Sequence, residues 1–215
     1  MKLKLALVSL LASVPVFATT VYGTNTPQFI GSNITQTRAA DSFTIGSSET
    51  ITDVQFFASV FSGVLADNFS GSITYAFYND AAGSLGSIVT SGTVNGLTGV
   101  SWGVCGAGQC STIDFALNSA LNLGAGTYWL EIHEGTSLSN NDGSAITWAG
   151  FNAVSGISLF SSSLETAPGT NSVSERSFSL FNNAASVPEP SSMLLIGGGL
   201  AGILLYKRRK NSPTR

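Results

Sequence analysis

Hydrophobic and polar residues alternate along much of this chain, in short segments separated by turn-forming residues. The alternation has a period of two, which is the repeat of a β-strand with one buried face. Gly, Ser, Asn and Asp between the segments favour tight turns. We therefore expect antiparallel strands joined by short connections. The expected strands are residues 41–46, 51–61, 72–80, 86–94, 111–118, 127–135, 143–151 and 174–182.

The same alternation predicts which side chains point into the core. Successive side chains of a strand point to opposite faces. In the segment 127–135, Trp129, Glu131 and His133 therefore share one face, which we expect to be the outer face. The side chains expected to point inward are Phe43, Ile45, Ile73, Tyr75, Phe77, Ile113, Phe115, Leu117, Tyr128, Leu130 and Ile132.

The strand pattern also limits the fold class. About eight to ten strands with regular turns and no convincing 3.6-residue repeat imply an all-β fold, an antiparallel sandwich or barrel. Parallel α/β folds alternate strands with helices and are excluded by this pattern. No repeat at a fixed spacing is evident, which argues against a solenoid or a propeller.

The first 18 residues have the composition of a secretory signal peptide. Lys2 and Lys4 precede a short apolar stretch, and Val16 and Ala18 fit the two small or apolar positions before a signal-peptidase site. We expect cleavage after Ala18. The alternative is a transmembrane helix, but Pro15 interrupts the apolar stretch, which is also too short to span a bilayer.

Residues 187–210, VPEPSSMLLIGGGLAGILLYKRRK, differ in composition from the rest of the chain. The run from Ser191 to Tyr206 would extend roughly 24 Å as a helix, against a hydrocarbon core of about 30 Å. It is therefore marginal as a permanent anchor, and its glycines weaken the helix further. The basic cluster should keep its end in the cytoplasm and place the β-domain outside. The cluster consists of Lys207, Arg208, Arg209 and Lys210.

Charge is distributed unevenly along the chain, whose formal net charge is -3. Between Thr19 and Val187 there are eleven acidic residues and only two basic ones, Arg38 and Arg176, which gives this region a formal charge of -9. Such a region is repelled by phosphate backbones and by anionic lipid. We therefore expect no nucleic-acid partner.

The two cysteines, Cys105 and Cys110, lie in the segment CGAGQC. Export would bring them into an oxidising compartment, where they are able to pair. Gly106 and Gly108 provide the backbone freedom that such a small ring needs. A zinc site would need further ligands, and a redox pair is more often spaced C-x-x-C. We predict a local disulfide.

His133 is the only histidine and lies between Glu131 and Glu134. A Glu-His pair is able to bind a metal or to act in acid–base catalysis. An exposed polar pair on the outer face of a strand is the more ordinary interpretation. A serine hydrolase would need a G-x-S-x-G segment, which does not occur. We assign no catalytic residue, no metal site and no cofactor.

The carboxylates offer weaker candidates. Asp53, Asp67, Asp80 and Asp142 lie near expected turns, where their oxygens are available to calcium. The best local segment is 140–144, NNDGS, but it lacks the D-x-[DN]-x-[DN]-G pattern and is better explained as an Asx-type turn. A pair of carboxylates for glycoside hydrolysis stays open, because such pairs have no required spacing in the sequence.

Four aromatic residues are candidates for a flat platform on which a sugar stacks: Trp102, Trp129, Trp148 and Tyr78. The alternative is packing in the core or within a sheet, since aromatic residues are favoured in strands whatever the function. Of the three tryptophans, Trp129 alone falls on an expected outer face.

The order of these segments resembles a jelly-roll-like domain often found in exported bacterial proteins with sorting tails. The resemblance covers residues 40–182 and is carried by ADSFTIGSSETITDVQFF, ITYAFYNDAAGSLGSIVTSGTV, ALNLGAGTYWLEIHEG, AITWAGF and RSFSLFN. These motifs are structural and not catalytic. The resemblance therefore implies a jelly-roll-like β-sandwich and no ligand.

The tail resembles the PEP-CTERM sorting signal, which is also labelled an ice-binding protein C-terminal domain. Its three ordered parts are VPEP, the glycine-containing apolar run and the basic cluster. The resemblance implies that Pro188, Glu189 and Pro190 form the recognition motif, that Met193–Tyr206 is a single transmembrane helix, and that Lys207–Lys210 is the stop signal. The ice-binding label does not by itself imply that the protein binds ice.

This resemblance also implies a course of processing. The expected handler is an exosortase, a membrane cysteine protease of Gram-negative bacteria that often make extracellular polysaccharide. We expect a signal peptide at 1–18, a secreted β-domain at 19–186 and a sorting signal at 187–210. Signal peptidase, the membrane and an exosortase would be successive partners, and a polysaccharide is a candidate partner at the cell surface or in the matrix.

The expected function is that of an exported, non-enzymatic protein of the cell surface or exopolysaccharide matrix, with a structural or glycan-binding role. Two alternatives stay open from the sequence. One is a secreted carbohydrate-active enzyme, and the other is a protein permanently anchored in the inner membrane.

Overall fold

The computed structural model describes residues 18–24, 27, 30–105, 108–138, 146–152, 158–161, 167–172 and 174–183. All of them lie in one compact unit, Ala18–Asn183. The predicted signal peptide, apart from Ala18, and the predicted sorting tail lie outside the described residues. Within the described ranges, no helix has the length and hydropathy that crossing a bilayer requires.

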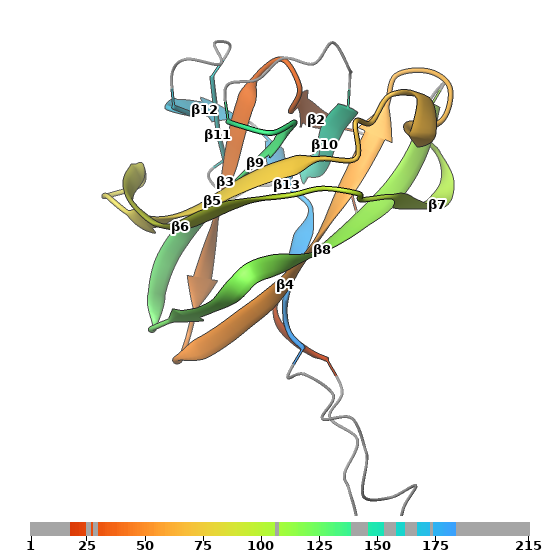
Figure 1. Cartoon of the computed structure of the whole chain (residues 1–215). Coiled ribbons are helices and arrows are strands. Elements are labelled where there is room, and N and C mark those ends of the chain that lie inside the picture. Colours follow the sequence, from red (N-terminus) through yellow and green to blue (C-terminus); the bar gives the residue numbers. More distant parts are fainter. Residues whose placement is uncertain are drawn as a thin grey trace, which may run out of the picture. The chain divides into compact units, whose positions relative to one another are not determined.

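The described part of the chain is built almost entirely of β-strands (Figure 1). Its one helical element is a short 3₁₀ helix, η1 (Leu65–Asp67). The strands are β1 (Thr19–Gly23), β2 (Ile30–Asn33), β3 (Arg38–Ile45), β4 (Glu49–Val60), β5 (Ile73–Asp80), β6 (Leu85–Val94), β7 (Gly99–Cys105), β8 (Gly108–Leu123), β9 (Gly126–Glu134), β10 (Ile146–Asn152), β11 (Ser158–Ser161), β12 (Thr170–Ser172), β13 (Ser174–Arg176) and β14 (Phe178–Asn182).

These strands form two antiparallel sheets, which we call sheet I and sheet II. Sheet I has the order β1-β14-β4-β10-β13, with β2 paired to β10 and with β8 paired to both β4 and β7. Sheet II has the order β12-β11-β3-β9-β5-β6. The chain passes repeatedly from one sheet to the other, since β3 of sheet II is followed by β4 of sheet I, and β8 of sheet I by β9 of sheet II. The all-β class is confirmed, and the jelly-roll-like order stays a prediction.

All eight strands predicted from the alternation are present. Residues 111–118 form the middle of the longer β8, and residues 174–182 are divided into β13 and β14 at Ser177. Five strands were not predicted. Four of them, β1, β2, β11 and β12, have three to five residues, which is too few to show a clear alternation. The fifth, β7, does alternate, since Val100, Trp102 and Val104 are separated by Ser101 and Gly103, and it was overlooked.

The core lies between the two sheets. Ten of the eleven side chains predicted to point inward are buried, and Tyr128 is partly buried against them. Phe178 of β14 lies near the centre, with its ring centroid 5.8 Å from that of Trp148 and 6.0 Å from that of Phe43. Tyr22 of β1 packs on the same ring at 5.1 Å. Phe178 thus joins both sheets and the first strand.

Replacing this central ring should cost much of the stability. Phe178 is fully buried, so we expect Phe178→Ala to lower the free energy of unfolding by about 3–5 kcal/mol through lost packing and the cavity left behind. Urea unfolding measures the change. The matched control is Ile88→Ala, because Ile88 is 56% exposed and its truncation should cost less than about 1 kcal/mol. Equal losses in the two variants would contradict this view of the core.

Candidate functional site

The outer face of β9 is covered, contrary to the sequence expectation. Trp129, Glu131 and His133 do share one face, but Trp129 is 1% exposed and the other two are fully buried. Leu159 of β11 packs with Trp129 in a second hydrophobic cluster on this side of sheet II, and the partly buried Leu138 packs against that cluster. The expectation of an exposed Glu-His pair was therefore wrong, because strand periodicity gives the face but not what covers it.

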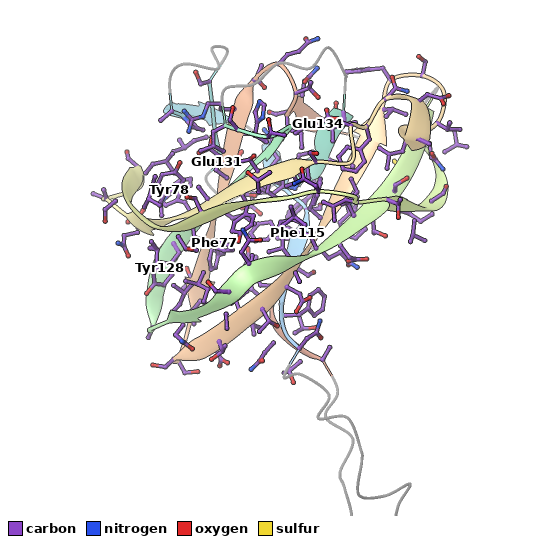
Figure 2. The ribbon with its side chains drawn as sticks, in the orientation of Figure 1. Phe77, Tyr78, Phe115, Tyr128, Glu131 and Glu134 are labelled. Atoms are coloured by element: carbon purple, nitrogen blue, oxygen red, sulfur yellow. The ribbon has the colours of Figure 1, made fainter. Side chains whose placement is uncertain are left out.

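Glu131 is held by an ion pair with Arg38, one of the two basic residues of the β-domain. Arg38 Nε donates to Glu131 Oε1 at 2.6 Å, and a second guanidinium nitrogen donates to Oε2 at 2.9 Å. Tyr78 Oη donates to the same Oε2 at 2.6 Å. Figure 2 shows Tyr78 and Glu131 close together on sheet II. Two N–H groups of one guanidinium and one hydroxyl thus compensate the cost of removing this carboxylate from water.

The pKa values of the two partners follow from this geometry. Burial would lower the pKa of Arg38, but the hydrogen bonds and the charge of Glu131 outweigh it and raise that pKa above its usual value. Burial, and next the negative charge of Glu131, raise the pKa of Tyr78 well above its usual range. Arg38 is therefore charged and Tyr78 is neutral throughout the physiological range, which suits a structural network.

Asp41 and Arg176 form a second buried contact, which connects the two sheets. The backbone N–H of Arg176 in β13 donates to Asp41 Oδ2 at 2.5 Å, and the N–H of Ser42 donates to Oδ1 at 2.9 Å. The guanidinium of Arg176 also donates to Ser32 Oγ in β2 at 2.5 Å. Burial raises the pKa of Asp41 well above its usual value. Burial also lowers the pKa of Arg176 to about 10.

Glu134 is the third buried carboxylate and lies at the end of β9 (Figure 2). It accepts a short hydrogen bond from Thr35 Oγ1 and a 2.7 Å hydrogen bond from the N–H of Ser70. Thr35 Oγ1 in turn accepts the N–H of Ile146 in β10 at 3.2 Å. These hydrogen bonds connect a loop, a turn and both sheets. Glu134 therefore also serves to hold parts of the domain together.

The proposed aromatic platform is not present as a surface. Trp129, Trp148 and Tyr78 are at most 5% exposed, and Trp129 Nε1 donates to Asp80 Oδ1 at 2.8 Å. Trp102 of β7 is the exception, since it is 40% exposed and its ring lies 6.0 Å from that of Phe57 in an edge-to-face arrangement. The hypothesis of a platform formed by all four residues was wrong, because three of them serve packing.

The candidate calcium ligands are dispersed. Asp53 lies within β4, Asp67 closes η1, and Asp80 accepts the N–H of Gly83 as well as the indole of Trp129. Asp142 and the segment 140–144 lie outside the described residues. Among the side chains that the structure does describe, no three His, Cys, Asp or Glu residues are grouped so that they could hold a metal ion.

The predicted disulfide lies at the closed end of the β7–β8 hairpin. Cys105 is paired in register with Gly108, and Cys110 with Gly103. Cys110 is fully buried, while the side chain of Cys105 lies outside the described ones. The described part of the chain holds no free cysteine, which agrees with the predicted bridge. The bridge itself stays a prediction.

Sequence reasoning missed the partners of the buried carboxylates. Arg38, Tyr78 and Arg176 come from strands distant in the sequence, and nothing in the local pattern connects them with Glu131 or Asp41. One feature of the sequence did bear on these partners, namely that the domain has many carboxylates and only two arginines. A buried carboxylate needs a counter-charge, so each arginine was a candidate partner for one.

Comparison with known families identifies the tail. Residues 186–210 match the model of the PEP-CTERM protein-sorting motif, whereas no curated protein matches the chain. The chain therefore combines a domain that is all-β in its described residues with a PEP-CTERM sorting motif. This motif indicates an exported protein that is transiently anchored in the membrane and then cleaved by an exosortase. The matched range begins one residue before the predicted 187–210, and the predicted domain limits stay predictions.

Breaking the buried ion pair should destabilise the domain strongly. Glu131→Gln would leave the Arg38 guanidinium, whose side chain is 11% exposed, without its counter-charge, and we expect a loss of about 3–5 kcal/mol in the free energy of unfolding. The control is Asp114→Asn, which removes a carboxylate that is exposed on β8 and should cost less than about 1 kcal/mol. Chemical denaturation of both variants measures the difference, and a loss below 1 kcal/mol in Glu131→Gln would contradict this role.

Asp41 should make the domain less stable as the pH rises. Between its usual pKa of 3.8 and its raised pKa in the folded state, the folded protein holds a proton that the unfolded chain has released. The free energy of unfolding therefore falls across this window, by at most about 1.4 kcal/mol per pH unit for one proton. Thermal melting at several pH values measures this.

The matched variant for this effect is Asp41→Asn, which keeps an acceptor oxygen and does not titrate. Glu175, whose pKa burial also raises, contributes in the same direction and remains in the variant. We expect a smaller fall in stability with rising pH in Asp41→Asn than in the wild type. Parallel pH profiles would show that Asp41 does not carry the effect.

Proposed function

We propose that the protein is a non-enzymatic component of the cell surface or exopolysaccharide matrix of a Gram-negative bacterium, with a structural or glycan-binding role. The observation that carries the proposal is the succession of an all-β domain and a PEP-CTERM motif at residues 186–210. Such a motif serves to deliver the preceding domain to its destination. The domain therefore acts after processing, away from the membrane that held it.

The surroundings of the acid–base residues support a role without catalysis. A general acid or base must come within hydrogen-bond reach of its substrate. His133, Glu131 and Glu134 are fully buried, and both glutamates accept hydrogen bonds from other parts of the domain. A substrate would have to displace Arg38 or the Ser70 backbone to reach these carboxylates. They are therefore better suited to holding the strands together.

The charge of the domain restricts the kind of glycan that it would bind. A formal charge of -9 between Thr19 and Val187 repels polymers rich in carboxylate or sulfate groups. A neutral polysaccharide is compatible with it. The exposed part of Trp102, braced by Phe57, offers a surface for stacking, and the neighbouring Gln55 and Asp114, joined by a 2.7 Å hydrogen bond, offer polar groups.

Processing at the motif is tested by intact-mass analysis of the exported protein. We expect the wild type to begin at Thr19 and to lack its KRRK end. Joint replacement of Pro188, Glu189 and Pro190 by alanine should block cleavage, because the enzyme would no longer recognise the extended segment. The variant should then retain its tail and stay with the membrane fraction.

The control variant is Pro213→Ala, which changes a proline beyond the basic cluster. If cleavage removes the C-terminal segment that contains residue 213, the mass of the processed variant should equal that of the processed wild type. A wild-type protein that keeps KRRK would instead support permanent anchoring and overturn the sorting proposal. Release of reducing sugars from neutral or acidic polysaccharides by the purified protein would overturn the non-enzymatic part.

A further inference from the structure

Exposed apolar side chains gather at one edge of sheet I. The described residues include seven exposed large hydrophobic side chains, and five of them belong to β7 or to the segment after β4. Val104 is 75% exposed, Phe61 73% and Val100 66%. Val64 and Trp102 complete the set, which we call the β7 patch. Val100 and Trp102 lie on the face of this edge that carries Phe57, and Val104 with the neighbouring Val64 lies on the other, so the edge is apolar on both sides. Exposed apolar surface commonly marks an interaction site.

The members of the β7 patch are held together by the fold. The N–H of Gln109, at the start of β8, donates to Gly63 O at 3.2 Å, which fixes the segment after β4 beside the β7–β8 hairpin. Val64 and Val104 line the same shallow hollow of about 390 Å³. On the outer face, Val100 and Phe57 are both paired with Thr112, and Trp102 contacts Phe57.

β7 is also an edge strand. In the part of the chain that the structure describes, it pairs with β8 and with no other strand. One row of its backbone N–H and C=O groups therefore faces away from the sheet, as a template for another strand. Natural edge strands are commonly protected by charged residues or proline, and β7 (GVSWGVC) has neither. Its bulge between Ser101 and Gly103 shortens the available ladder without removing it.

The distribution of charge leaves this edge open to a second copy of the protein. The domain has a formal charge of -9, so a second copy is repelled by most of its surface. The segment from Ala81 to Ile113, which contains β6 and β7, has no charged residue. Two copies are therefore able to approach at β7 without bringing carboxylates together. Antiparallel pairing of β7 with itself would be isologous and would close after two subunits.

We propose that β7 is the self-association surface of this protein, where a second copy adds its own β7 in antiparallel orientation. The pairing extends sheet I across the two subunits and places Val100 and Trp102 of both copies on one continuous face. The patch is limited to one short strand and its neighbours. The dimer is therefore weak and reversible, as expected for interfaces below about 1,200 Å². This inference does not rest on the proposed function.

Sedimentation velocity of the protein recovered from the producing cells tests the proposal, over a concentration range of roughly 1 to 100 μM. We expect a monomer–dimer equilibrium that is strengthened by added salt, because salt screens the repulsion between two acidic copies. Val100→Asp and Val104→Asp should each weaken dimerisation at least about tenfold, since each places two like charges at the interface. Both side chains are exposed, so unchanged melting curves will show that the variants fold.

The matched control is Ile88→Asp, which adds the same charge at an exposed apolar position of β6, an edge strand of sheet II. It should dimerise like the wild type. A wild type that stays monomeric at every concentration overturns the proposal. So does dissociation in Ile88→Asp, or a Val100→Asp variant that dimerises normally. A monomeric wild type whose binding to a neutral polysaccharide is lost in Trp102→Ala would assign the patch to glycan instead.

Discussion

The structure depends on how an acidic domain with two cations accommodates its buried carboxylates. Asp41, Glu131 and Glu134 are at most 2% exposed. An unpaired charge in such a place would cost several kcal/mol. The guanidinium of Arg38 pairs with Glu131, whereas Arg176 contacts Asp41 through its backbone N–H, and burial raises the pKa of Asp41 well above its usual value. The buried carboxylates fix the relative positions of β3, β9 and β13, and with them the contact between the sheets.

The buried contacts also determine which surfaces of the domain are exposed and able to bind a partner. The outer face of sheet II at β9 is occupied by the ion pair of Arg38 and by the packing of Trp129 with Leu159. A face covered by its own chain is closed to ligands. Sheet I differs at β7, where apolar side chains are exposed and the strand has one partner. An exposed surface is therefore better sought on sheet I than on β9, where the sequence predicted an outward-facing Trp129, Glu131 and His133.

Much of the fold could be predicted because its signal is local. Alternation alone identified strands such as β5 and β9 and the inward direction of Phe77 and Leu130, since the period of two acts within each strand. The cover on β9 could not be predicted, because Leu159 is far from Trp129 in the sequence and the connection between them is set by topology. The same holds for Arg38 and Glu131. β7 is different, because its alternation of Val100, Trp102 and Val104 with Ser101 and Gly103 was present in the sequence and was overlooked.

The sorting motif was recognisable for the same reason that the strands were, because its three parts follow one another along the chain. The domain that precedes it is described by itself. Every described core residue lies between Ala18 and Asn183. The first and last strands of this unit pair with each other, with Thr19 opposite Asn182. Tyr22 and Phe178 join that pair to the aromatic core. Cleavage on either side of this unit therefore removes no hydrogen bond of the β1–β14 ladder, so processing need not disturb the domain.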